Sequence, residues 1–235
     1  MFTRLIGLVL LGALASASAE DYEIEGKAYN VDDIEQLLYV ERYTPVDDND
    51  RGEVHYESPE GERLATKTLD YSAGNTKPDY ELIDERGDRH WSVTLEDGSL
   101  KLSKGPKDDP ETDTVSAEDP QVIDAGFDAF VQLEWDKLMD GKRVTFHFAF
   151  PNRLTNVRLR AVHIERGDSP IEQDGEDWVW FQIRVDSALM SLFADSLYLA
   201  YERDTKRLMV FRGRSNLPAA DGDSWDVEIR YTYSD

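Results

Sequence analysis

Short strand-like segments separated by turn residues fill most of this chain, and this pattern constrains its fold more than any other feature. In residues 142–150, 196–203 and 224–233, apolar side chains alternate with polar ones. A period of two residues is typical of a sheet with one buried and one solvated face. The turns at 58–61, 85–88 and 96–98 are too short for the crossover between parallel strands, so neighbouring strands are expected to be antiparallel.

Thirteen segments qualify as strands because turn or loop residues bound each of them. They are 21–29, 38–44, 52–58, 62–71, 79–86, 89–95, 99–103, 142–150, 156–165, 177–186, 196–203, 207–214 and 224–233.

One segment, 120–140, has a clear helical period, with apolar residues recurring every three or four positions. Asp124 is its expected N-cap and Gly141 its expected end. Shorter helical turns are expected at 32–38 and 187–195. The predicted fold is α+β and predominantly antiparallel β: a curved sheet or half-barrel of roughly eleven to thirteen strands, covered by one main amphipathic helix.

The charge and the absence of cysteine exclude several classes of function. Among 235 residues, 49 are acidic and 26 are Lys or Arg, which gives a net charge of −23. A surface this negative repels phosphates, so nucleic acid is not an expected partner. With no cysteine, the chain has no disulfide, no catalytic thiol and no thiolate-ligated metal. The acidic residues are spread along the chain, which favours a role in solubility over a cation-binding surface.

The first nineteen residues read as a secretory signal peptide. Arg4 precedes an apolar run from Leu5 to Ala15, and Ala17-Ser-Ala19 provides a cleavage pattern. The run is shorter than the roughly 20 residues that span a bilayer, and no later segment approaches that length. We therefore expect a periplasmic protein, with secretion as the alternative, no transmembrane segment in the mature chain, and one β-rich domain over 20–235.

Residues 104–120 are expected to form a mobile acidic loop, since they contain three prolines, six acids and almost nothing apolar. Residues 166–177 have the same character. No histidine spacing matches a metal motif, and no nucleophile elbow or phosphate-binding glycine loop is present. The sequence therefore predicts no metal, no cofactor and no catalytic residue. Because carboxylates are so many, a hydrolase that uses two of them stays open as a hypothesis beside the two function classes given below.

The aromatic residues in the predicted strands allow two interpretations. They form the core between sheet and helix, or they line an apolar cavity for a lipid or acyl chain. On the second interpretation, the ligand-lining candidates are Phe146, Phe148, Trp178, Trp180, Tyr198, Tyr201 and Phe211.

Two stretches carry a resemblance to a known family. They are Gly126-Phe-Asp-Ala-Phe130 with Glu134-Trp135 and Phe146-His-Phe148, and the closing strands from Tyr198-Leu-Ala-Tyr201 through Arg207–Leu217 to Val227–Tyr231. They are similar to uncharacterised exported proteins of gammaproteobacteria, which in turn resemble the half-barrel of the lipoprotein carriers LolA and LolB. The resemblance implies a concave, helix-covered sheet that shields acyl chains. A long amphipathic N-terminal helix is missing here, and only 32–38 is a candidate for it.

Two function classes follow from these observations. The first is a non-enzymatic carrier or sensor of a hydrophobic ligand such as a lipid or acyl chain. The alternative is an envelope protein-interaction module, which predicts a filled core with an unpaired sheet edge or exposed apolar patch in place of a cavity.

Overall fold

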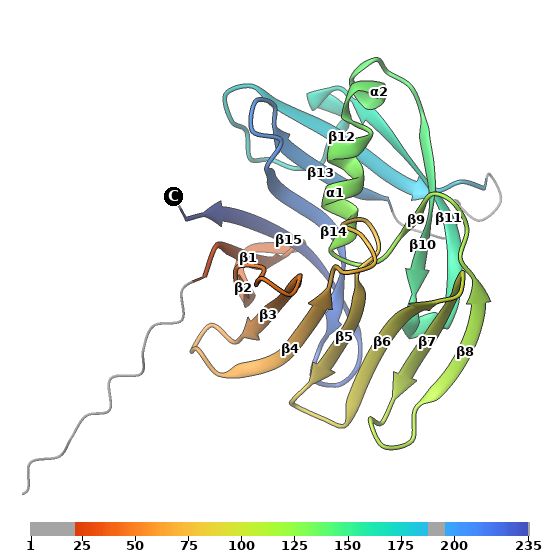
Figure 1. Ribbon diagram of the computed structural model, residues 1–235. Helices are drawn as coiled ribbons and strands as arrows, with labels where there is room; N and C mark the ends of the chain where they lie inside the picture. Colours follow the sequence, from red (N-terminus) through yellow and green to blue (C-terminus); the bar gives the residue numbers. More distant parts are fainter. Residues whose placement is uncertain (1–21, 188–195, 235) are drawn as a thin grey trace, which may run out of the picture.

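The computed structural model describes residues 22–187 and 196–234 as one curved, predominantly antiparallel sheet with two helices (Figure 1). The first eight strands are β1 (Ile24–Asn30), β2 (Asp33–Tyr43), β3 (Arg51–Glu57), β4 (Arg63–Asp70), β5 (Asp79–Asp84), β6 (Arg89–Glu96), β7 (Ser99–Gly105) and β8 (Glu111–Ser116). The elements that follow are β9 (Gln121–Val122), α1 (Gly126–Leu133), α2 (Trp135–Met139), β10 (Val144–Phe150), a 3-10 turn η1 (Pro151–Arg153), β11 (Thr155–Ile164), a second turn η2 (Arg166–Asp168), β12 (Trp178–Val185), β13 (Leu197–Glu202), β14 (Leu208–Pro218) and β15 (Ser224–Tyr233).

The sheet consists of two meanders joined in the middle by β1 and β15. Its strand order is β8-β7-β6-β5-β4-β3-β2-β1-β15-β14-β13-β12-β11-β10-β9. Every neighbouring pair is antiparallel except β9 and β10, which are parallel. The short turns predicted at 58–61, 85–88 and 96–98 do connect antiparallel neighbours, as the alternation and turn residues indicate.

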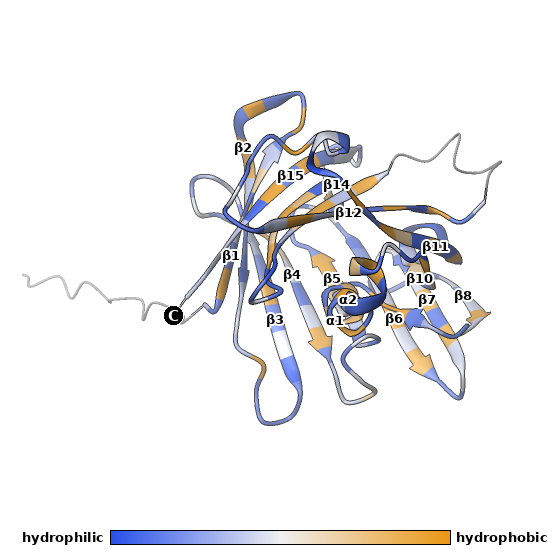
Figure 2. Ribbon diagram, turned by 90° about the horizontal axis from the view of Figure 1, so that it is seen from above, coloured by the Kyte–Doolittle hydropathy of each residue, from blue (hydrophilic) through white to orange (hydrophobic). Residues whose placement is uncertain are grey.

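The sheet curls until its two ends lie close together, and the two helices lie inside the curve (Figure 2). The β8 end approaches β11, and η1 packs on β6 and β7. No backbone ladder joins β8 to β9, β10 or β11 within the described residues, so the sheet stays open along this line. A sheet this wide curls because each strand is twisted relative to the next, and flat sheets of such width are unusual.

The fold class is confirmed in its coarser form, and several details differ from the prediction. The described residues contain fifteen strands instead of eleven to thirteen. Residues 32–38, expected as a helical turn, belong mostly to β2, and the expected loop 104–120 contains β8. Residues 188–195 of the expected turn at 187–195 lie outside the described residues.

The helical segment is also divided differently. Two short helices, α1 and α2, replace the single expected helix, and the chain turns between them at Glu134. The N-cap residue of α1 is Ala125, not Asp124. Asp124 instead has a φ of 38° and directs its carboxylate to Lys67 and Asn216. Gly141 follows α2 with a φ of 73°, a conformation that glycine adopts readily.

Candidate functional site

The concave side of the sheet is filled by side chains of α1 and α2. Phe130 packs on Phe146 with ring centroids 4.7 Å apart, and Trp135 meets Phe181 edge-on at 5.5 Å. Phe130, Phe146 and Phe181 are almost completely buried, and Trp135 nearly so. Short helices are only marginally stable alone, so this packing provides most of their stability. The helices thus occupy the place where a carrier would hold its ligand.

The seven residues predicted to line a cavity lie on two different faces of the sheet. Phe146, Phe148, Tyr201 and Phe211 pack in the concave core around α1 and α2 or beside it. Trp178, Trp180 and Tyr198 lie on the convex face, in a separate cluster built on Ile171, Ala200 and Val210.

The register explains this division. Trp180 pairs with Ala200, which pairs with Val210, whereas the alternate residues Val179 and Phe181 point inward. The segment 166–177 covers the convex cluster: Ile171 is fully buried there, and the Arg166 guanidinium lies 5.3 Å from the centre of the Trp180 ring. The two indoles lie two residues apart on β12 and so share a face, but that face is the outer one.

A charged network lies buried on the concave side of the first meander. The ammonium group of Lys67 on β4 donates to Asp124 Oδ2 at 2.6 Å, and Asn216 Nδ2 donates to Asp124 Oδ1 at 3.1 Å. Lys67 has only 3% of its side-chain surface exposed, and Asp124 has 12%. The network ties the β9–α1 connection to β4 and β14, and so holds α1 against the sheet.

Glu41 adds a second carboxyl group to this network. Its Oε2 accepts hydrogen bonds from Tyr43 at 2.8 Å and Tyr231 at 3.3 Å. Burial raises the pKa of Glu41, although Lys67 and Tyr43 act in the opposite direction. Burial alone would lower the pKa of Lys67, but Asp124 and Glu41 outweigh it and raise that pKa. Such buried ion pairs are costly to desolvate, so the network favours one specific arrangement more than it adds stability.

Sequence reasoning missed this network, although one signal for it exists. Lys67 stands between Ala65 and Leu69 on the alternate positions of β4, which are the buried ones. A lysine at an inward position requires a carboxylate partner, because an isolated buried charge is strongly unfavourable. The partner lies 57 residues away in the connection before α1, where no local pattern marks it.

A further acid with a raised pKa lies on α1. Burial raises the pKa of Asp128 to about 6. Gln132 Nε2 donates to Asp128 Oδ2 at 2.8 Å. The hydroxyl group of Tyr201 lies beside the same carboxyl group. Both Tyr201 OH and Asp128 Oδ1 are buried, and neither makes a hydrogen bond of good geometry to a described residue.

Three residues fasten the two ends of the sheet, and Asn156 makes the contact that crosses from one end to the other. Gln121 on β9 and Asn156 on β11 exchange two hydrogen bonds, of 2.9 and 3.2 Å. Asn156 Nδ2 also donates to the carbonyl oxygen of Ser116 on β8 at 3.1 Å. We call Gln121, Asn156 and Ser116 the clasp. It replaces at one point the backbone ladder that a closed barrel would have.

The two best-formed pockets of the described residues are both shallow and polar. One, of about 300 Å³, is lined by Tyr22, Glu25, Arg42, Thr232, Tyr233 and Ser234. The other, of about 220 Å³, is lined by Val31, Asp32, Ile34, Glu172, Arg212 and Glu228.

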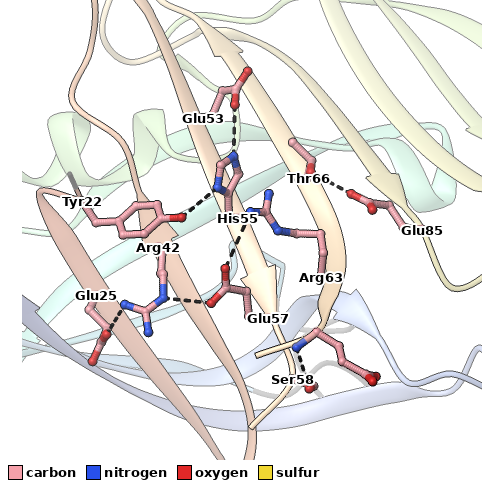
Figure 3. A network of polar contacts seen from close by, with 11 residues as sticks. Tyr22, Glu25, Arg42, Glu53, His55, Glu57, Ser58, Arg63, Thr66 and Glu85 are labelled. Atoms are coloured by element: carbon pink, nitrogen blue, oxygen red, sulfur yellow. Dashed lines mark hydrogen bonds and ion pairs between the residues drawn. The ribbon is translucent and has the colours of Figure 1, made fainter. Parts of the chain in front are cut away.

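The first pocket borders a network of ion pairs across the first strands (Figure 3). Arg42 is held between Glu25 and Glu57, and His55 lies between the Tyr22 hydroxyl at 3.2 Å and Glu53 at 3.1 Å. The charge of Arg42 is thus offset by two carboxylates. This arrangement suits cross-strand cohesion better than anion binding.

No cluster of three or more His, Asp or Glu side chains suited to a metal ion occurs within residues 22–187 and 196–234. Among the same residues, no helix is both long enough and apolar enough to cross a bilayer.

The outer edge of β8 carries open backbone groups. Ala117 N–H donates to Gly98 O, and this bond sets the phase of the β7–β8 ladder. The phase turns the backbone groups of Thr112, Thr114 and Ser116 away from β7. Asp113 Oδ1 accepts from Thr114 N–H, and the clasp uses Ser116 O. The N–H and C=O of Thr112 and the C=O of Thr114 have no partner among the described residues.

Comparisons with known proteins identify no family. The chain matches no family model, and no curated protein is a significant match. Among solved structures, the chain is similar to the crystal structure of a beta-barrel-like protein of domain of unknown function DUF1849 from Brucella abortus. The sequence identity is 10%, the TM-score is 0.44, and the match covers 92% of this chain and 100% of the other. The likeness is weak, the function of that protein is itself unknown, and no link to LolA, LolB or gammaproteobacterial proteins emerges.

Proposed function

We propose that this chain is a non-enzymatic protein-interaction module of the cell envelope, which binds its partner through the outer edge of β8. One observation carries this proposal: the concave side is occupied by the protein's own side chains, with Phe146 and Tyr201 both fully buried. A filled interior combined with an open strand edge is the combination that the interaction hypothesis predicts. The envelope location rests on the signal-like pattern of residues 1–19.

Site-specific crosslinking tests the proposal, and the absence of native cysteine makes it straightforward. The thiol of Thr112→Cys carries an attached photoactivatable crosslinker, which places the reactive group at the open edge. Thr68→Cys is the matched control, because Thr68 is also an exposed strand threonine but β4 has strand neighbours on both sides. Each protein is expressed in the bacterial envelope and irradiated. We expect a crosslinked band of defined mass from Thr112→Cys alone. No band, or the same bands from both variants, contradicts the proposal.

Carriage of an apolar ligand is the second candidate function. The small size of α1 and α2, the two helices inside the sheet, favours it. A ligand would take the place of α1 and α2, whose eight and five residues depend on apolar packing for their stability. Apolar burial contributes roughly 25 cal/mol per Å², so the area of one acyl chain is large enough to provide the binding affinity of a carrier.

The test for the carrier uses lipid extracts of the purified protein and a fluorescent fatty-acid probe. A co-purifying lipid, or saturable probe binding that quenches Trp135 fluorescence, supports the carrier. If neither a co-purifying lipid nor probe binding is observed, the carrier is refuted and the interaction module remains.

A further inference from the structure

The chemistry of the partner can be inferred from β8, on the assumption that the proposed function is correct. Residues on one strand point alternately to the two faces of a sheet. Glu111 and Asp113 therefore share one face of β8, and Thr112 and Thr114 share the other. All four side chains are exposed. A strand added at this edge would meet two carboxylates on one side and two threonines on the other.

The carboxylates near this edge are poorly compensated. Glu111 pairs with Lys104 at 3.1 Å, and among the described residues Asp113 accepts only the Thr114 backbone N–H. The side chains of Asp108, Asp109, Glu118 and Asp119 form no hydrogen bond or ion pair with a described residue. The edge is thus strongly negative, and its open backbone groups centre on Thr112.

The same charges disfavour a second copy of this chain as the occupant. Two β8 edges placed together would set acidic residues against acidic residues, and like charges on paired strands are destabilising. Charged side chains on edge strands commonly protect them from self-pairing. A partner with the opposite charge would be attracted where a second copy is repelled.

We propose that β8 binds an extended segment of a partner protein in which Lys or Arg alternates with Thr, Ser or Val. The segment continues the sheet beyond β8. Its backbone pairs with the N–H and C=O of Thr112 and with the C=O of Thr114. Its basic side chains lie along Glu111 and Asp113, and its small side chains lie along Thr112 and Thr114. Backbone pairing provides affinity and the alternating charge provides specificity, as in other cases of strand addition.

The test uses a fluorescein-labelled seven-residue peptide in which lysine alternates with threonine or valine, and fluorescence anisotropy with the full chain. The control peptide has glutamate in place of each lysine. We expect the lysine peptide alone to bind, with an affinity that falls as salt rises because exposed charges are screened.

Two variants at one position separate backbone pairing from side-chain contact. Thr112→Pro removes the outward N–H without removing a bond to β7, and should weaken binding about tenfold, the effect of one hydrogen bond at the upper end of its range. Thr112→Val keeps the N–H and should bind as the wild type does. Circular dichroism verifies that both variants fold. Equal binding by Thr112→Pro, or binding of the glutamate peptide, overturns the proposal.

The double variant Glu111→Gln/Asp113→Asn tests whether these acids only guard the edge. We expect it to lose most of the binding of the lysine peptide. If the wild type binds no peptide while the double variant self-associates in ultracentrifugation, the acids serve only to prevent self-pairing of β8. The proposal then fails. Specific crosslinking at Thr112→Cys without lysine-peptide binding would refute the partner chemistry but leave the interaction module intact.

Discussion

Replacing Asp128 by asparagine should stabilise the protein at alkaline pH and have little effect at pH 4. Burial moves the pKa of Asp128 from its ordinary value of 3.8 to about 6. The native state therefore holds this proton more tightly than the unfolded chain does. The resulting stability is complete below pH 3.8 and is lost as the pH rises through 6. With 1.36 kcal/mol for each pKa unit, the loss amounts to about 3 kcal/mol at pH 8.

Asparagine removes this titration and keeps the local contacts. Its amide oxygen can accept the hydrogen bond from Gln132, and its NH₂ group then faces the Tyr201 hydroxyl. Urea unfolding at pH 4 and pH 8, followed by tryptophan fluorescence, measures the effect. We expect the unfolding free energy of Asp128→Asn to exceed that of the wild type by up to about 3 kcal/mol at pH 8. Asp136→Asn, an exposed acid on α2, is the control. An equal difference at both pH values refutes the reasoning.

Three further predictions concern contacts that hold α1 and the sheet ends in place. Lys67→Met should reduce the unfolding free energy by about 3–5 kcal/mol, because it leaves Asp124 buried without its cation. Adding Asp124→Asn should recover part of this loss. Strictly additive effects of the two substitutions in denaturant melts would contradict the pairing. Asn156→Ala breaks the clasp and should cost about 1–3 kcal/mol, with faster amide hydrogen exchange in β8 and β9 but not in β3; uniform exchange would argue against a local role. Gly126→Ala places a Cβ 2.3 Å from the Thr76 carbonyl oxygen and should cost about 1–3 kcal/mol, whereas Gly167→Ala, which has open space around it, should change the thermal midpoint little.

The sequence predicted those parts of the fold that depend on local patterning. Alternating residues such as Val144, Phe146 and Phe148 identified strands, and the glycines of short turns identified antiparallel neighbours. Curvature also followed, because a sheet with this many strands does not stay flat.

The rest depended on contacts between distant residues. The strand β8 was hidden because prolines and acids have low strand propensity, and pairing with β7 overrides that preference. Alternation puts Trp178 and Trp180 on one face of β12, but it does not say which face of a strand is the inner one. The Lys67–Asp124 pair required knowledge of which connection crosses the sheet.

The pairing of β1 with β15 has a consequence for synthesis and folding. Ile24 lies opposite Tyr233 in the antiparallel β1–β15 ladder, so one of the earliest strands made finds one of its two neighbours only among the last. Before that moment each meander exposes a row of unpaired backbone groups at the centre of the future sheet. Contacts between such distant residues slow folding, since a long loop must close before they form. The nascent chain therefore passes through a stage with two half-sheets whose open edges can pair with other chains. A chaperone that shields β1 until β15 is made would raise the yield of folded protein.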